Sequence, residues 1–266
     1  MIGIGPDAPE HIATGERGPA DRAPHPVLTR YYKNRDEHHP FVIALFDGAA
    51  RHYDRVCQLI SLGSGQLYRR STLERLGLRA GMTLLDVATG TGLMARAALS
   101  IVREPAAVVG LDPSAGMLHE ARKRLLGPLV QGRMEVLPFR TRRFDVVTIG
   151  YALRHAADLD VAFAECLRVL KPGGRLLVLE ITRAASPLRR GLIRLHFTLI
   201  LPAIMRLSTR NRSAHLLTRY YWDTIAECVP PAAILDSLRR VGFTAGQVRV
   251  LGGFLSEYTA VKPLLS

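Results

Sequence analysis

Hydrophobic runs of two kinds alternate along residues 82–181. Short continuous runs such as MTLLDVA, AAVVGLD, FDVVTIGYAL and RLLVLEI are typical of strands that are buried on both faces. The segments between them, among them GLMARAALSIV, SAGMLHEARKRLL and DVAFAECLRVL, repeat their apolar residues at helical spacing. We expect the last helix to stop at Lys171-Pro172-Gly173-Gly174, because a basic residue followed by helix breakers ends a helix.

This alternation predicts an α/β fold: a Rossmann-like, doubly wound, mainly parallel sheet with helices on both faces. PLVQGRM adds a strand, and GQVRVLGG and FLSEYTAVKP supply two closing strands, which makes a seven-stranded sheet. In this architecture, ligands bind at the carboxyl ends of the strands.

Three further regions surround this core. Residues 1–40 are rich in Gly, Pro, His and charge and lack periodicity, so we expect a mobile N-terminal tail. Residues 41–80 have helical periodicity and predict cap helices ahead of the first strand. Residues 182–241 are helical with long apolar faces, and we expect them to form an insertion over the active site. A single domain would then span residues 41–266.

The chain of 266 residues is strongly basic, with 36 Lys and Arg against 23 Asp and Glu, a net charge of +13. This excess suits an anionic partner, whether nucleic acid, membrane surface or acidic substrate, but it consists almost entirely of arginine, which genome composition can inflate. Cys57, Cys166 and Cys228 have no ligand-like spacing and indicate free thiols in a reducing compartment, with no metal site.

Two segments of the chain are candidates for targeting or membrane signals. Its first residues lack the pattern of a signal peptide, and its most apolar segment, residues 191–207, is interrupted by charge and proline. We therefore expect a cytoplasmic protein. Two interpretations of residues 191–207 stay open: a buried cap helix, or a helix that associates with a membrane surface through flanking arginines.

The segment LLDVATGTGLMARAAL carries the first chemical signal. Gly90, Gly92 and Ala95 fit the dinucleotide pattern G-x-G-x-x-A, and Asp112 follows at the end of the next strand. Asp86, however, ends the first strand, where a carboxylate facing the crevice would repel a diphosphate. It would instead favour a ligand with an ammonium group or a cationic sulfur, as in S-adenosylmethionine. The glycines would let the backbone approach this ligand, and Asp112 would accept hydrogen bonds from ribose hydroxyls.

Longer motifs carry a family resemblance. FDGAARHYDRV, LISLGSGQLYRR, LLDVATGTG, GLDPSAGML, EVLPF, FDVVTIGYALRH and LRVLKPGGRLLVLE follow one another over residues 44–262. With them the chain resembles class I S-adenosylmethionine-dependent methyltransferases and, more narrowly, the ubiquinone/menaquinone-biosynthesis C-methyltransferase family. The resemblance implies S-adenosylmethionine as cofactor and a small aromatic acceptor, a lipophilic quinol or phenol that is methylated on carbon.

The resemblance also implies which residues bind the cofactor: Tyr53, Asp86, Ala88, Gly90, Thr91, Gly92, Asp112, Met117, Arg133 and Met134. One pair departs from the family, which has Asp or Asn and then Ala where this chain has Arg133 and Met134. Arginine cannot accept a hydrogen bond from the adenine amino group. We expect Met134 to offer an apolar wall, with backbone groups or Glu135 supplying the polar contact.

Arg154 and His155, which follow the fourth strand, are the candidate catalytic residues. The resemblance implies that Arg154 orients a water molecule or stabilises a developing phenolate. His155 could titrate near neutrality and act as a base, or cap the following helix. Residues expected at the acceptor are Tyr151, His196, Tyr221 and Trp222, although an aromatic stripe and a lone histidine also suit a protein core.

Other functions remain to be weighed. An O- or N-methyltransferase of a natural-product pathway is left open by Arg133, Met134 and Gly150, where the family commonly has serine. A nucleic-acid methyltransferase would suit the charge, but the fourth strand ends in GYALRH, without an Asn/Asp-Pro-Pro-Tyr loop or a cysteine. A nicotinamide oxidoreductase and a cofactor-binding protein without catalysis are further alternatives. We expect no specific nucleic-acid partner, and self-association as a homodimer stays open.

Overall fold

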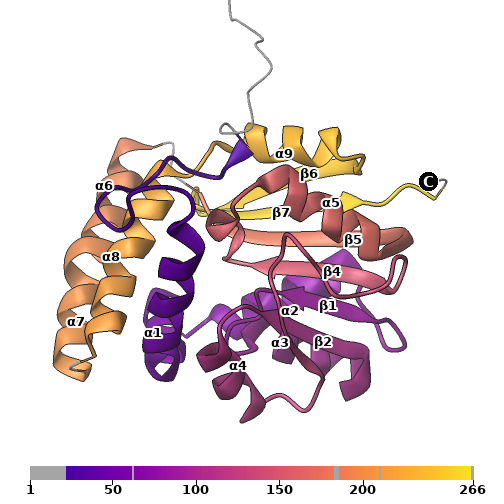
Figure 1. The fold of residues 1–266 in the computed structure, drawn as a ribbon, viewed down its shortest axis with the longest axis horizontal. Helices are drawn as coiled ribbons and strands as arrows, with labels where there is room; N and C mark the ends of the chain where they lie inside the picture. The colour runs from indigo at the N-terminus through magenta and orange to yellow at the C-terminus, as the bar shows by residue number, and fades with distance from the viewer. Residues whose placement is uncertain (1–21, 62, 183–185, 210, 265–266) are drawn as a thin grey trace, which may run out of the picture.

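The computed structural model describes residues 22–61, 63–182, 186–209 and 211–264 (Figure 1). Its centre is a seven-stranded sheet in the order β3-β2-β1-β4-β5-β7-β6. The parallel strands are β1 (Leu84–Val87), β2 (Val108–Asp112), β3 (Leu129–Gln131), β4 (Phe144–Gly150) and β5 (Leu170–Ile181). β7 (Leu255–Val261) pairs antiparallel with both β5 and β6 (Thr244–Leu251). The predicted seven-stranded, mainly parallel sheet is confirmed.

Helices cover both faces of the sheet because alternate residues of each strand point to opposite sides. Leu84 and Val146 pack with α2 (Gly65–Leu76) and α3 (Leu93–Val102). The next residues, Leu85 and Val147, pack on the other face with α5 (Leu159–Val169) and α9 (Pro231–Arg240). Helix α4 (Ala115–Arg122) follows β2. This double covering explains why the strands have continuous apolar runs instead of alternating ones.

A second layer of helices stands at the carboxyl ends of the strands (Figure 1). It consists of α1 (His38–Ser61), α6 (Pro187–Leu195), the π-helical turn η4 (His196–Ile200), α7 (Leu201–Ser208) and α8 (Arg212–Glu227). Their buried side chains, together with Ile181 at the end of β5, form a hydrophobic core separate from the cores around the sheet. We call α1 and α6–α8 the helical cap.

The structure corrects three sequence expectations about the elements. Residues 22–40 do not form an unpacked tail: Tyr32 and His38 are buried against the helical cap, and α1 begins at His38 instead of Phe41. Rings explain this packing, because Tyr31 and Tyr32 contact Phe41 of α1. Residues 1–21 lie outside the described residues.

The second correction concerns α9, which belongs to the sheet layer instead of the predicted insertion over the site. Its Ser237 and Arg240 bind Asp160 of α5. The third concerns β5, which begins at Leu170, so that Lys171-Pro172-Gly173-Gly174 belongs to this strand; α5 ends before Lys171, as predicted. No helix in the described part of the chain is long and apolar enough to cross a membrane.

Candidate active site

Two adjoining cavities lie between the strand ends and the helical cap. The first, which we call the cofactor cleft, is lined by residues that follow β1, β2 and β4 and by one side of α1. The second, the acceptor cavity, has a volume of about 440 Å³ and is lined mainly by α1, α2, α6 and η4, with Tyr221 of α8 and the start of β7. Tyr53 and Tyr151 line both. The arrangement therefore offers one ligand site on each side of a pair of tyrosines.

The loop after β1 forms the floor of the cofactor cleft. Ala88, Gly90 and Gly92 all have left-handed backbone angles, with φ of 55°, 56° and 82°. A Cβ on Gly90 would lie 3.8 Å from Cε1 of Tyr53, an ordinary contact, so the backbone angle and not a lack of space favours glycine there. Gly92 caps the start of α3. Ala88 and Gly90 line the cleft, as predicted for cofactor-binding positions.

Asp86 contradicts the expected picture of an open carboxylate. Its side chain is 0 % exposed and accepts hydrogen bonds from the Thr89 hydroxyl (2.6 Å), the Thr148 hydroxyl (2.8 Å) and the Ala95 amide (3.1 Å). Burial raises its pKa to about 6, although these donors oppose the shift. Asp86 therefore holds the loop and the first turn of α3 in place. It also lines a small cavity together with Arg69 and Gly150.

Asp112 does lie where the sequence predicted, in the wall of the cofactor cleft at the end of β2. Its two oxygens accept hydrogen bonds from the amides of Gly90 (2.8 Å) and Ser114 (2.9 Å). Burial raises its pKa to about 6. Because each carboxylate oxygen can accept a second hydrogen bond, Asp112 keeps the capacity to bind ribose hydroxyls.

The far end of the cleft combines apolar walls with one acidic group. Met117 and Met134 are buried there, and Arg133 lies at the rim, 3.7 Å from Glu135. Glu135 Oε1 accepts from the Ala157 amide at 2.9 Å, while its buried Oε2 has no hydrogen-bond partner among the described residues. Burial acts to raise the pKa of Glu135, but His39 and the Ala157 amide hold it below its usual value. An ionised acceptor between methionine side chains suits the amino group and flat faces of adenine.

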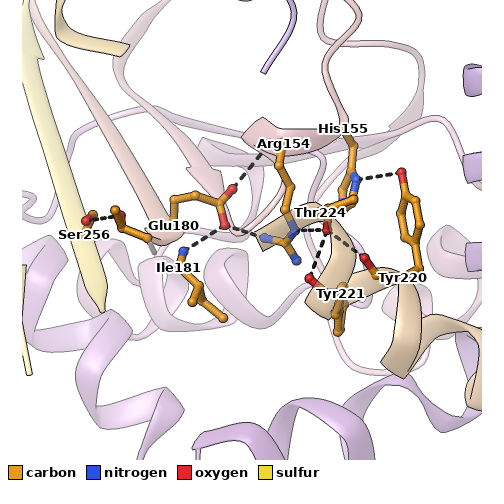
Figure 2. A network of polar contacts seen from close by, with 9 residues as sticks. Arg154, His155, Glu180, Ile181, Tyr220, Tyr221, Thr224 and Ser256 are labelled. Carbon is orange, nitrogen blue, oxygen red and sulfur yellow. Dashed lines mark hydrogen bonds and ion pairs between the residues drawn. The ribbon is translucent and has the colours of Figure 1, made fainter. Parts of the chain in front are cut away.

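Arg154 and His155 lie on a short helical turn, η3 (Leu153–His155), and their side chains separate from one another (Figure 2). Arg154 lines the acceptor cavity. Its guanidinium is ion-paired with Glu180, donates to the Thr224 hydroxyl at 3.1 Å and lies 4.9 Å from the ring centre of Tyr221. Glu180 was not predicted as a site residue, although it ends the motif LRVLKPGGRLLVLE and pairs with Arg154.

His155 lines the cofactor cleft instead. Its ring stacks on Tyr220, with Nδ1 3.5 Å from the Tyr220 hydroxyl, and its buried Nε2 meets no hydrogen-bond partner in the described part of the chain. Burial, aided by the charge of Arg154, lowers the pKa of His155 well below its ordinary value. The expected titration near neutrality is therefore wrong, because desolvation keeps the ring neutral.

The acceptor cavity is mostly apolar, and its lining brings together three of the predicted acceptor residues, Tyr151, His196 and Tyr221. The His196 ring has a buried Nε2 that lacks a hydrogen-bond partner among the described residues, and burial lowers its pKa. Trp222 is not brought to this cavity but lines a separate surface pocket with Arg190 and Arg194. Successive residues of a helix point about 100° apart, so α8 directs Tyr221 and Trp222 to different sides.

Tyr151 is held in an unusual conformation between the two cavities. Its φ is 61°, a left-handed angle that costs free energy for a residue with a side chain. Its amide donates to the Leu179 carbonyl at 2.7 Å, and the Arg69 guanidinium lies 5.4 Å from its ring centre. Arg69, which is buried, was not predicted as a site residue, although it lies in the quoted motif LISLGSGQLYRR.

Helix α1 is fastened to the cofactor-binding loops by two aspartates. Asp47 accepts hydrogen bonds from the Ser114 hydroxyl and the Gly116 amide at the start of α4. Asp54 accepts from the Thr91 hydroxyl and pairs with Arg124. The Thr91 side chain, expected to contact the cofactor, is thus turned toward α1. These contacts keep Tyr53 over the cleft.

Comparison with known proteins identifies relatives over nearly the whole described chain. The model of the ubiE/COQ5 methyltransferase family matches residues 32–262. A demethylmenaquinone methyltransferase from Clavibacter sepedonicus is 35% identical over 228 residues, which are 84% of this chain and 90% of that protein. A ubiquinone/menaquinone biosynthesis C-methyltransferase from Legionella pneumophila is 32% identical over 229 residues, 83% of this chain and 90% of that one.

Solved structures share the fold at lower identity. An S-adenosylmethionine-dependent methyltransferase from Thermotoga maritima has a TM-score of 0.59 and 19% identity, covering 83% of this chain and 99% of that one. The [4+2]-cyclase SpnF has a TM-score of 0.58 and 18% identity, covering 84% and 96%. At these identities the similarity establishes the class I methyltransferase fold, and the reaction has to come from the family and the site.

Proposed function

Because the chain belongs to the ubiE/COQ5 methyltransferase family and is an S-adenosylmethionine-dependent methyltransferase, we propose that it methylates a ring carbon of a lipophilic hydroquinone. Relatives at 32–35% identity over most of their length carry names that specify demethylmenaquinone or ubiquinone/menaquinone biosynthesis. This family context favours a quinol acceptor over the phenols and amines of natural-product pathways.

The observation that carries the proposal is the apolar cavity beside the cofactor cleft. Ile60, Ile193, Phe197, Phe254 and Leu255 supply much of its wall, and its volume of about 440 Å³ suits an aromatic ring with a hydrocarbon substituent. A charged or strongly polar acceptor would lose its hydration there without enough partners to replace it.

The residues of the cofactor cleft fit S-adenosylmethionine. Asp112 would bind the ribose hydroxyls, and Met117 and Met134 would enclose the adenine ring. Glu135 Oε2, which accepts no hydrogen bond in the described part of the chain, would accept from the adenine amino group. When bound, the cofactor supplies a methyl group that is already activated by a positively charged sulfur. The protein needs no nucleophilic side chain, so its contribution is alignment and proton transfer.

His196 and Arg154 are the residues that we assign to the acceptor. The half-buried, neutral ring of His196, whose Nε2 is buried, can take the proton of a hydroquinone hydroxyl, which makes the neighbouring ring carbon nucleophilic. Arg154 would stabilise the resulting phenolate, with Glu180 holding the guanidinium in place. After the new carbon–carbon bond forms, the ring carbon loses its hydrogen as a proton and aromaticity returns. The ring oxygen takes its proton back from His196, so that one proton is released overall.

Product analysis tests the proposed function. We expect the enzyme, supplied with S-adenosylmethionine labelled with ¹³C in the methyl group, to label a prenylated demethyl-naphthohydroquinone. NMR should show the labelled methyl carbon bonded to a ring carbon, with a slower reaction for the hydroquinone that lacks the tail. A label on oxygen or nitrogen, or transfer only to small polar phenols and amines, would contradict the proposal.

A further inference from the structure

The segment α6–η4–α7 carries apolar side chains on two opposite faces. Its inner face, with Phe197, Leu201 and Met205, is buried in the helical cap. Its outer face displays a row of exposed side chains at helical spacing, between 44 and 91% exposed: Leu188, Leu192, Leu195, Leu199 and Leu207. Apolar residues around a whole helix are typical of one that is covered on both sides. We call this outer row the leucine face.

Positive charge surrounds the leucine face. Between Glu180 and Asp223 the sequence contains eight arginines and no acidic residue. At helical spacing, Arg189 and Arg194 fall on either side of the leucine row. In the part of the chain that the structure describes, no carboxylate forms an ion pair with Arg189, Arg194 or Arg206. An uncompensated basic rim around exposed leucines indicates a partner that is apolar and carries negative charge at its surface.

The leucine face also borders the acceptor cavity. Leu192 is 58% exposed on the outer row and lines the acceptor cavity at the same time. Ile193, the next residue, and His196, about one turn further along the same segment, also line this cavity. A lipophilic molecule at the leucine face would therefore be next to the cavity wall without crossing water.

We propose that the leucine face docks on a bilayer that contains anionic lipids, with the leucines in the outer acyl region and the arginines at the headgroup phosphates. The entry of the acceptor from that bilayer past Leu192 is the part that rests on the proposed function. A second copy of the chain is a poorer occupant, because a symmetric pairing of this face would bring Arg189, Arg194 and Arg206 against their own counterparts. Figure 1 shows α6 and α7 on the side of α8 and α1 away from the sheet, where a planar surface can meet them.

Vesicle sedimentation of the full chain, without cofactor or acceptor, tests the docking. The wild type is expected to bind vesicles of equal parts phosphatidylglycerol and phosphatidylcholine more strongly than vesicles of phosphatidylcholine alone. The double variant Leu188→Ser/Leu199→Ser should bind the anionic vesicles about tenfold more weakly, because two side chains no longer enter the acyl region. The matched control Leu67→Ser/Leu126→Ser changes leucines that are 75% and 85% exposed on other elements, and should bind like the wild type.

Two results would overturn the docking proposal. One is equal vesicle binding by the leucine-face variant and the wild type. The other is a wild-type dimer in size-exclusion chromatography that becomes a monomer in the variant, which would assign the face to a second copy.

Methyl transfer to a detergent-dispersed hydroquinone separates this proposal from the proposed function: Leu188 and Leu199 lie outside the acceptor cavity lining, so the variant should keep the wild-type rate. Loss of vesicle binding with normal transfer supports docking, whereas normal binding without transfer contradicts only the proposed reaction.

Discussion

Two carboxylates, Asp86 and Asp112, lie buried at the ends of neighbouring strands in a protein of net charge +13. Both have backbone amides as donors, and burial raises the pKa of each to about 6. The two carboxylates differ in role. The oxygens of Asp86 accept hydrogen bonds from the loop after β1 and from the first turn of α3, whereas Asp112 lines the cofactor cleft. A buried acid at the end of a strand can therefore act as a structural anchor for the ligand-binding loop.

A substitution at Asp86 should change how stability depends on pH. The folded state keeps its proton up to about pH 6, whereas an unfolded aspartate loses it near its usual pKa of 3.8. The stabilisation of folding due to this group is thus complete below about pH 4 and is lost as the pH rises to 6. Between pH 4.5 and 7, the free energy of unfolding of Asp86→Asn, which cannot titrate, should therefore fall by about 2 kcal/mol less than that of the wild type. Urea unfolding at pH 4.5 and 7 measures it.

Asp236→Asn is the control for Asp86→Asn, because Asp236 is about half exposed and pairs with Arg239 on the surface. This variant should lose the same free energy of unfolding as the wild type between pH 4.5 and 7. An equal loss in Asp86→Asn and wild type would show that the Asp86 carboxyl does not keep its proton in the folded state.

His196 should take a proton from the hydroxyl group of the hydroquinone that receives the methyl group. We expect His196→Gln to lower kcat by roughly 10²- to 10⁴-fold, the usual contribution of a general base. Its cofactor affinity should stay unchanged, since His196 lines the acceptor cavity. Because burial lowers its pKa below 6.5, the wild-type rate should be constant near neutrality and fall only at lower pH, as the ring becomes protonated.

His155→Gln provides the contrast. His155 lines the cofactor cleft, so this change should weaken binding of S-adenosylhomocysteine and leave the pH profile of kcat unchanged. Calorimetry and steady-state kinetics measure the two effects. A His196→Gln enzyme with wild-type kcat would contradict the assignment of His196 as the base.

At the scale of elements, α1 is the helix of the helical cap that is attached to the cofactor-binding loops of the sheet. Asp47 and Asp54 are seven residues apart, close to two helical turns, so their side chains lie on the same side of α1. One binds the start of α4 and the other binds the loop after β1. These contacts explain why the motif FDGAARHYD carries aspartates at its second and ninth positions.

Loosening this attachment should weaken cofactor binding. Asp54→Asn keeps the shape of the side chain but removes the charge that Arg124 and Thr91 bind. We expect the Kd for S-adenosylhomocysteine to rise about tenfold, equivalent to one charged hydrogen bond of about 1.4 kcal/mol. Isothermal titration calorimetry measures it, and Asp36→Asn, on the exposed segment before α1, is the control. Equal affinities of the Asp54 variant and the wild type would mean that α1 holds its position without this contact.

Sequence patterns predicted the elements well and their partners less well. The strands and their count follow from local apolar runs, and Asp112, Met117 and Met134, which the motifs indicate, line one cavity in the structure. The partner of Asp86, Thr148, comes from another strand 62 residues away, and no local pattern reports it. Tyr221 and Trp222 likewise fit one aromatic stripe, yet only packing of α8 decides which one faces the acceptor cavity.

The whole molecule combines a widespread fold with a specialised cap. The sheet is shared with proteins as different in name as a methyltransferase and a [4+2]-cyclase, at 18–19% identity. The helical cap supplies most of the apolar wall around the acceptor, and its sequence between Glu180 and Asp223 contains eight arginines and no acidic residue. Specificity for the acceptor should therefore reside in α1, α6, η4 and α8, while the sheet provides the cofactor cleft. Self-association as a homodimer stays a prediction.

A crystal structure of the enzyme with S-adenosylhomocysteine and a prenylated hydroquinone tests the central claim most directly. The account predicts that the ring lies in the acceptor cavity beside Tyr53 and Tyr151, with one hydroxyl within hydrogen-bond distance of His196 and the tail against α6. A ring bound outside this cavity, or a hydroxyl that faces neither His196 nor Arg154, would contradict it.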